Sequence, residues 1–275
     1  VQIQKSAQLA ADLDNFKTAN ARVTKHAPVA LINDNNIHIL QNLHPPSLQR
    51  GCIKARTSTR SGGTRRRIKV TPKDILKTLS HLNRGKAPGI HCDSLDIYVN
   101  AARSLSLDVP RHFTRAKALA GFFTRVINGD VPERFKHFLR QTYLVALEKD
   151  PNDKTKLRPL GVPSAIRRIA GILVLHEYSA VFAEHLLPFN FATGIGGGID
   201  VIIKSIQLAV DKYIIEPEEN GDLPSRALVS LDIKNMFNAV SRERLREIIS
   251  DLFPTLEPFA DLIYESAGET FVRFE

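Results

Sequence analysis

The sequence predicts an α+β fold that is mostly helical and contains only a few strands. Apolar residues recur at helical spacing through much of the chain, whereas two short apolar runs, "YLVALEKD" and "ALVSLDI", are typical of strands. Proline-containing polar stretches such as "NLHPPSLQRG" and "EPEENGDLPS" separate these elements. At 275 residues the chain can bury a large core, as one large domain or as two ordinary ones.

The first helices are predicted upstream of the first strand. Residues 9–23 have a helical pattern, which the prolines of "NLHPPSLQRG" interrupt. Thr71 and Pro72 are typical of an N-cap and a first helical residue. Three apolar residues follow on one face of that helix: Ile75, Leu79 and Leu82. Residues 111–138 then predict two helices separated by the turn "NGDVP".

The second half of the chain predicts strands and capped helices. "YLVALEKD" predicts a strand, and a polar turn at 151–156 leads into "KLRPLGVP". Ser164 is the expected cap of a long helix that ends near residue 187. Asp200 and Ser241 are expected to cap two further helices, and "ALVSLDI" lies between them as a strand. The helix after Asp200 is expected to have an apolar face.

Positive charge is concentrated in one segment. The chain carries 38 Lys and Arg residues against 29 acidic ones, a net charge of +9, and residues 35–73 hold nine basic residues and no acid. Without this segment, basic and acidic residues balance at 29 each. The block includes Arg65, Arg66 and Arg67, with Ser, Gly and Thr between its charges, and favours contact with a nucleic-acid backbone. A solvated loop or a sorting signal is the alternative interpretation.

Several classes of protein are disfavoured by the sequence. Its longest apolar run, residues 169–175, is too short to span a membrane, so we expect no membrane partner. The chain begins without a methionine or an apolar signal core, which we interpret as part of a longer intracellular protein. Cys52 and Cys92 have neither the spacing of a CxxC pair nor that of a zinc site, and are interpreted as ordinary thiols.

The segment "VSLDIKNMFNAVSRERL" ends an apolar run with one carboxylate, Asp232, and places an aromatic residue, Phe237, five positions later. A strand without polar alternation is expected inside a sheet that helices cover on both faces. A buried carboxylate costs free energy unless it is paired or bound to a metal ion, and magnesium carrying a substrate's phosphates would satisfy it. A turn or an arginine partner would also satisfy Asp232, so these residues alone leave both interpretations open.

Four segments resemble, in the same order, blocks of the reverse transcriptases of non-LTR retrotransposons and group II introns. They are "NRGKAPGIHCDSL", "LEKDPNDKTKLRPLGVPSAIRRIAG", "FATGIGGGID" and "SLDIKNMFNAVSRERL", and they cover roughly residues 71–252. The resemblance implies a right-hand polymerase fold. Its parts would be an N-terminal helical region with a basic arm (1–70), helix-rich fingers (71–225) and the start of the palm sheet (226–275).

The resemblance also implies roles for the residues around the last strand. Asp232 and the backbone carbonyl of Ile233 would bind two magnesium ions. Backbone amides near Asn235 and Met236 would face the incoming triphosphate. Phe237 would lie under the nucleotide sugar, where its ring excludes a 2′-hydroxyl and so selects deoxynucleotides.

Four basic residues acquire roles from the same resemblance. Lys149 and Arg158 would bind the triphosphate, although two other lysines of the same hairpin compete with Lys149 for this assignment. Arg167 and Arg168 would support the fingers or contact the template, and an exposed helix surface is the alternative for both.

The sequence departs from the family at two points. Where the family's first block continues with "PDG", this chain has "IHCD", so no role is assigned to Asp93. The family's second catalytic motif, Tyr-x-Asp-Asp, has no counterpart, because the chain contains no adjacent aspartates. The chain is therefore expected to be an incomplete reverse transcriptase domain that does not polymerise by itself.

The predicted function of the longer parent protein is RNA-templated DNA synthesis, in which a primer 3′-hydroxyl attacks a deoxynucleoside triphosphate. An RNA template, a DNA primer and deoxynucleoside triphosphates are the expected partners. A non-catalytic nucleic-acid-binding module with the same fold is the first alternative. A doubly wound nucleotide-binding enzyme that uses "GIGGGID" is the second, although no GK[ST] follows these glycines.

Overall fold

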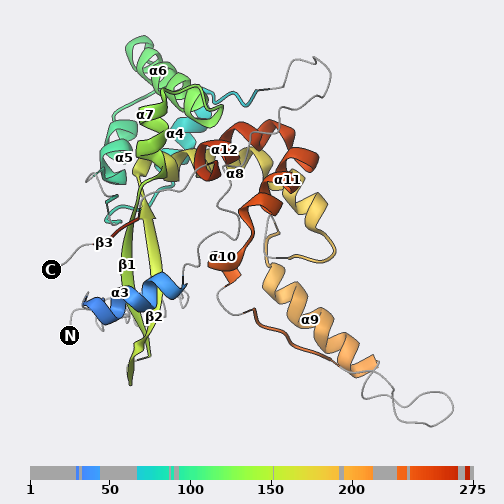
Figure 1. Cartoon of the computed structure of the whole chain (residues 1–275). Helices are drawn as coiled ribbons and strands as arrows, with labels where there is room; N and C mark the ends of the chain where they lie inside the picture. Colours follow the sequence, from blue (N-terminus) through green and yellow to red (C-terminus); the bar gives the residue numbers. More distant parts are fainter. Residues whose placement is uncertain are drawn as a thin grey trace, which may run out of the picture.

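The described residues form a group of helices from which a β-hairpin extends (Figure 1). The computed structural model describes residues 29–30, 33–43, 67–86, 88–89, 93–150, 152–191, 195–212, 228–233, 236–265 and 270–272. Within these residues the fold is mixed α+β, mostly helical with one three-stranded sheet. This agrees with the class that the sequence predicts.

Helix α4, Pro72–Ser80, begins where the sequence predicts. The Thr71 hydroxyl accepts a hydrogen bond from the backbone N–H of Asp74 (3.2 Å), and the Asp74 carboxylate accepts one from the N–H of Thr71 (2.9 Å). This reciprocal pair satisfies two backbone donors at the start of the helix. Ile75 and Leu79 are fully buried on its inner face.

Three further helices follow before the sheet: α5 (Leu95–Arg103), α6 (Pro110–Ile127) and α7 (Glu133–Arg140). The last two are the pair predicted within 111–138. Gly129 lies in the turn between them with a φ of 73°, a conformation that favours glycine. One stripe of α6 faces the core through residues spaced four and three apart: Ala116, Ala120 and Phe123.

The sheet consists of a β-hairpin and a short third strand. β1 (Thr142–Asp150) and β2 (Asp153–Pro163) are antiparallel, and β3 (Thr270–Val272) is parallel to β1, which gives the order β2-β1-β3. The first strand confirms the prediction from "YLVALEKD". The second strand already begins at Asp153, so the turn is shorter than the predicted 151–156.

Helix α3, Asp34–Leu43, packs against the hairpin. Its Leu40 lies in a small buried cluster with Leu144 and Ala146 of β1 and Leu157 of β2. Side chains alternate between the two faces of a strand, so this cluster identifies the covered face of the hairpin. The opposite face is free of this helix.

Helix α8, Ala165–Leu186, follows β2 directly and runs through the main core (Figure 1). The Ser164 hydroxyl caps it by accepting a hydrogen bond from the backbone N–H of Arg167 at 3.2 Å, as the sequence predicts. Its buried residues, Ile169 and Leu173 among them, belong to the cluster that also contains the inner faces of α4 and α6.

The same core includes residues near the C-terminal end of the chain. Helix α11 (Arg242–Leu252), a 3₁₀ turn (Pro254–Leu256) and helix α12 (Glu257–Tyr264) lie along it, and Leu256 and Leu262 are buried in the main cluster. The Ser241 hydroxyl caps α11 by accepting from the N–H of Arg244 at 3.1 Å, which confirms that prediction. Residues from both sides of the expected boundary at 225 and 226 thus share one core, while the three-part division stays a prediction.

Residues 228–233 differ from the expected strand. In the described part of the chain they pair with no strand, and they are exposed, Leu231 by 87%. A strand needs a neighbour for its backbone N–H and C=O groups and a cover for its apolar side chains, and the described residues supply neither to this segment. The buried strand predicted from "ALVSLDI" is therefore wrong for these residues. The short helix α10 follows at Met236–Ala239.

Helix α9, Gly198–Val210, also differs from its prediction. It begins at Gly198, and Asp200 lies within its first turn instead of capping it. A Cβ at Gly198 would collide with the Phe191 carbonyl oxygen, so the close approach of the two segments requires glycine. The apolar residues of α9 remain largely exposed, with Leu208 at 70%, because the described residues do not cover them.

None of the described helices is both long enough and apolar enough to cross a membrane. The helix predicted at residues 9–23 lies outside the described residues.

Candidate nucleic-acid interface

The β1–β2 hairpin carries three exposed cations that form no ion pair within the described part of the chain: Lys149, Lys154 and Arg158. Arg158 lies opposite Leu147, so it projects from the face of the hairpin that α3 does not cover. Lys149 lies nearer the tip, where a register shift between Glu148 and Asp150 interrupts the pairing. All three cations can bind a phosphate without first breaking another ion pair.

Lys156, one of the two lysines that compete with Lys149, is already paired at the hairpin tip. Its Nζ lies 3.2 Å from Asp150 Oδ2 and 3.3 Å from Asp153 Oδ2. The hydrogen bond to Asp150 is the largest cause that raises the pKa of Lys156, and the one to Asp153 is the second. Binding a phosphate would require Lys156 to leave both aspartates, so the hairpin geometry favours Lys149 and Lys154 over Lys156 as phosphate ligands.

The start of α8 holds the other two predicted basic residues. Arg167 is half-buried, and its Nη1 donates a hydrogen bond to Thr142 Oγ1 at 3.4 Å, which joins α8 to the start of β1. Burial lowers the pKa of Arg167, but the ordinary value is so high that the guanidinium stays charged. Of its two predicted roles, supporting the hairpin is the one this geometry favours. Arg168 is half-buried beside it.

A distant segment docks onto the same helix start through Gly89 and Asp93. Asp93 Oδ2 accepts a hydrogen bond from the backbone N–H of Ala165 at 2.5 Å, which places a carboxylate at the positive end of α8. A Cβ at Gly89 would lie 2.6 Å from Asp93 Oδ1 and 2.9 Å from the Cα of Ser164. Only glycine leaves room for this approach. Gly89 and Asp93 therefore join the segment "NRGKAPGIHCDSL" to the start of α8, which belongs to the segment "LEKDPNDKTKLRPLGVPSAIRRIAG".

Sequence reasoning missed the role of Asp93. A helix cap is usually recognised within about three residues of the N–H group it accepts from, whereas Asp93 lies 72 residues before Ala165. No local pattern therefore identifies it. The nearest available signal is the glycine of "GKAPG", which indicates a close backbone approach without showing to what.

The residues around Asp232 lie away from the hairpin. Asp232 and Ile233 belong to the exposed segment 228–233, and Met236 begins α10. Figure 1 shows this segment and α10 apart from β1 and β2. Asn235 lies outside the described residues, and so does the side chain of Phe237, whose backbone is part of α10.

The described residues do not fit the two-magnesium site that the resemblance implies. Within them, no three Asp, Glu, His or Cys side chains are grouped so that they could hold a metal ion. Each magnesium ion needs several oxygen ligands, and two adjacent ions need carboxylates that bridge them. The exposed Asp232 is a single carboxylate, so we assign no catalytic step to the described residues.

The end of the basic arm is anchored on α6. The N–H of Ile68 donates to Asn128 Oδ1 (3.2 Å), and the N–H of Val70 donates to Thr124 Oγ1 (3.0 Å). Arg67 forms an ion pair with Asp130, so one of the three predicted nucleic-acid contacts already has a partner. Arg65 and Arg66 lie outside the described residues.

No protein-family model matches this chain, and no curated protein sequence matches it either.

Proposed function

We propose that this chain forms the fingers part of an intracellular reverse transcriptase and binds the primed RNA template and the incoming deoxynucleotide. One structural observation supports the proposal in addition to the sequence motifs. The hairpin with Arg158, the start of α8 with Arg167, and the Gly89–Asp93 segment interlock through specific contacts. Two blocks that resemble the polymerase family separately in sequence thus meet in space, as parts of one binding unit should.

Each basic residue is assigned a role that fits its surroundings. Arg158 and Lys149 are exposed cations without an ion pair in the described part of the chain, and they would bind the triphosphate. Arg167 is held by Thr142 and would position the hairpin that carries them. The basic arm, with Arg65, Arg66 and Arg67, would contact the nucleic-acid backbone, and Arg168 would reach the template beside Arg167.

The chemical step belongs to the longer parent protein in this proposal. There, Asp232 and the Ile233 carbonyl would share two magnesium ions with carboxylates beyond the described residues. Backbone amides near Asn235 and Met236 would face the triphosphate, and Phe237 would exclude the 2′-hydroxyl of a ribonucleotide. In the parent, replacing Phe237 with Val should then admit ribonucleotides while deoxynucleotide incorporation persists.

The nucleotide-binding part can be tested on the chain itself. A fluorescent deoxynucleoside triphosphate is titrated into the chain bound to a primed RNA template, and anisotropy gives the dissociation constant. Arg158→Gln should weaken binding by about tenfold or more, because a charge-assisted bidentate interaction with phosphate is removed. Lys156→Gln removes one charge from the same hairpin, at a side chain already paired with Asp150 and Asp153, and serves as the matched control. If Lys156→Gln weakens binding as much as Arg158→Gln does, the hairpin acts only through its net charge and the assignment of Arg158 is wrong.

The non-catalytic alternative predicts a different result in the parent protein. A reverse transcriptase extends a primer on an RNA template, and Asp232→Asn abolishes the extension. A binding module holds the primed template with the same affinity in both variants and never extends it. Primer extension by the parent protein, compared with its template affinity, distinguishes the two functions.

A further inference from the structure

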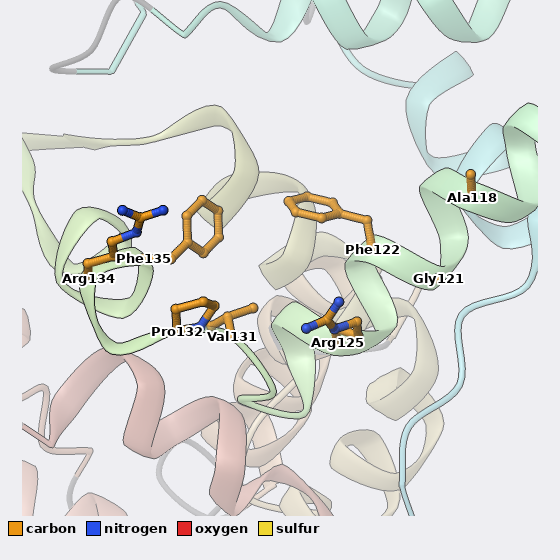
Figure 2. Close-up of a pocket in the computed structure, with 8 residues that line it drawn as sticks. All are labelled: Ala118, Gly121, Phe122, Arg125, Val131, Pro132, Arg134 and Phe135. Atoms are coloured by element: carbon orange, nitrogen blue, oxygen red, sulfur yellow. The ribbon is translucent and has the colours of Figure 1, made fainter.

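A groove between α6 and the start of α7 belongs to none of the sites described above. It has a volume of about 500 Å³ and is lined by six apolar residues and two arginines. Figure 2 shows the rings of Phe122 and Phe135 next to each other, with Val131 and Pro132 below Phe135. The groove is thus a mostly apolar surface feature on the helical part of the molecule.

The walls of the groove are already in place without a partner. Phe122 is 36% exposed, and its ring packs edge-to-face with Phe135 at 6.1 Å between centroids. Phe135 in turn stacks on Phe138 at 5.4 Å, which holds it against α7. Gly121 leaves the α6 side of the groove bare, because a Cβ there would meet no atom within 4 Å. Preformed apolar grooves of this kind bind large apolar side chains at low entropic cost.

The surroundings of the groove are strongly positive. Helix α6 carries Arg111, Arg115, Lys117 and Arg125 and contains no acidic residue. None of these four forms an ion pair within the described part of the chain, and the same holds for Arg134 on the other side of the groove. Arg125 is oriented by a hydrogen bond from its Nε to the Asp130 carbonyl (3.3 Å). These cations favour a partner that is negatively charged around its apolar part.

We propose that this groove binds an acidic peptide segment of a partner protein, with a large apolar side chain over Gly121 beside the rings of Phe122 and Phe135, and carboxylates against Arg125 and Arg134. A nucleobase fits the lining less well, because none of the lining side chains accepts a hydrogen bond from the amino groups and ring N–H that a base carries. An apolar side chain leaves no polar atom unsatisfied there. This surface is separate from the hairpin, so the inference does not depend on the proposed polymerase function.

The probe for this proposal is a short fluorescent peptide with a central Phe-Leu pair flanked by Asp and Glu, titrated into the full chain at low salt. Gly121→Leu should weaken binding by about tenfold or more, since the new side chain occupies the space of the apolar anchor. Arg134→Gln should weaken binding by about two- to fivefold, as expected for one partly exposed ion pair. A peptide with Ala in place of the Phe-Leu pair should bind little.

Matched controls separate the groove from general effects. Ala180→Leu adds the same side chain on the exposed surface of α8, and Lys204→Gln removes one exposed charge from α9; both should leave peptide binding unchanged. The proposal is overturned if Gly121→Leu and Ala180→Leu bind the peptide equally, or if Arg134→Gln and Lys204→Gln do. It is also overturned if single-stranded RNA, and not the peptide, loses affinity in Gly121→Leu, because the groove would then be a nucleic-acid site.

Discussion

Gly89 and Asp93 show how much single residues decide at the start of α8. The missing side chain of Gly89 lets its backbone lie against Ser164, and the Asp93 carboxylate accepts from the N–H of Ala165. A carboxylate at a helix N-terminus is favoured by both the free backbone donors and the helix dipole. The position of the α8 start relative to the preceding helices therefore depends on these two residues.

Gly89→Ala should lower the free energy of unfolding by about 1 to 3 kcal/mol, because the new methyl group meets backbone atoms that cannot move aside freely. Gly121→Ala is the matched control. Its Cβ enters open space in the middle of a helix, so it should stabilise the protein by up to about 1 kcal/mol. Urea unfolding of both variants measures the difference. Equal midpoints for the two variants would contradict the close approach at Gly89.

Arg140 is a second residue whose surroundings decide its role. It is buried at the end of α7, where its Nε donates to the Leu262 carbonyl (2.9 Å). Its two other nitrogens lie 3.3 Å from a Glu133 oxygen and 3.2 Å from a Glu265 oxygen. This single side chain joins α7 to α12, so we assign it to stability and not to nucleic-acid binding.

Arg140→Met should destabilise the fold by about 1 to 3 kcal/mol, because the buried Leu262 carbonyl loses its charged donor. Arg134→Met on the same helix exposes no such group and should change stability by no more than about 0.5 kcal/mol. Thermal unfolding followed by circular dichroism compares the two. A smaller effect at Arg140 than at Arg134 would show that the connection between α7 and α12 does not depend on this guanidinium.

At the scale of the element, the tip of the β-hairpin is a charged turn held by its own hydrogen bonds. The N–H of Asn152 donates to Asp150, and the Thr155 hydroxyl donates to Asp153 at 2.5 Å. The pKa of Asp150 and that of Asp153 are both held below the usual value. The largest cause is the hydrogen bond from Asn152 for Asp150 and the one from the Thr155 hydroxyl for Asp153, and Lys156 lowers both further. Their stabilising contribution is present above the unfolded-state pKa and is lost as the pH falls through the folded-state pKa.

Lys156 has the opposite dependence. Its pKa is raised, so its contribution is present below the unfolded-state pKa and is lost as the pH rises through the folded-state value. Thr155→Val should raise the pKa of Asp153 more than Lys156→Gln does, because the Thr155 hydroxyl is the largest cause of the shift. Carboxyl titration by NMR measures both. A larger rise in Lys156→Gln would reverse the order of these two interactions.

Local sequence patterns predict where several helices begin, but they do not predict whether a strand finds a partner. Helices α4, α8 and α11 begin at the residues their capping side chains predict, because a cap and the N–H groups it accepts from lie within one turn. Residues 228–233 have the composition of a buried strand, but the described chain pairs no strand with them. A strand's stability depends on its neighbours, which its own residues do not specify.

For the whole molecule, charge is the property most relevant to the proposed function. The excess of basic residues comes from residues 35–73, and its described end is anchored along α6 by Asn128 and Thr124. Arg67 is partly compensated by Asp130. Nucleic-acid binding should therefore depend more on the other arginines of the arm than on Arg67.

Replacing Arg65, Arg66 and Arg67 with Ala should weaken binding to nucleic acids of different sequence by similar factors. The slope of log affinity against log salt should flatten by about 0.7 to 0.9 for each phosphate that the arm no longer neutralises. Arg67→Ala alone should flatten the slope by less than this amount, because Asp130 already occupies that guanidinium. Titrations at several salt concentrations test this, and an unchanged slope in the triple variant would identify the arm as a solvated linker.

The sequence by itself determined the α+β class, the starts of the capped helices, the first strand of the hairpin and the concentration of charge. These features depend on periodicity, capping and composition, which act within a few residues of the chain. Only the tertiary structure decided that Asp93 accepts from Ala165, that Arg140 is buried between two helices, that Lys156 is paired while Lys149 is not, and that a groove remains open beside Gly121. The contacts of Asp93 and Arg140 depend on which distant segments pack together, which the shape and burial of the folded core decide and no local pattern reveals. The pairing of Lys156 depends on the geometry of the hairpin turn, and the groove beside Gly121 depends on how α6 and α7 pack.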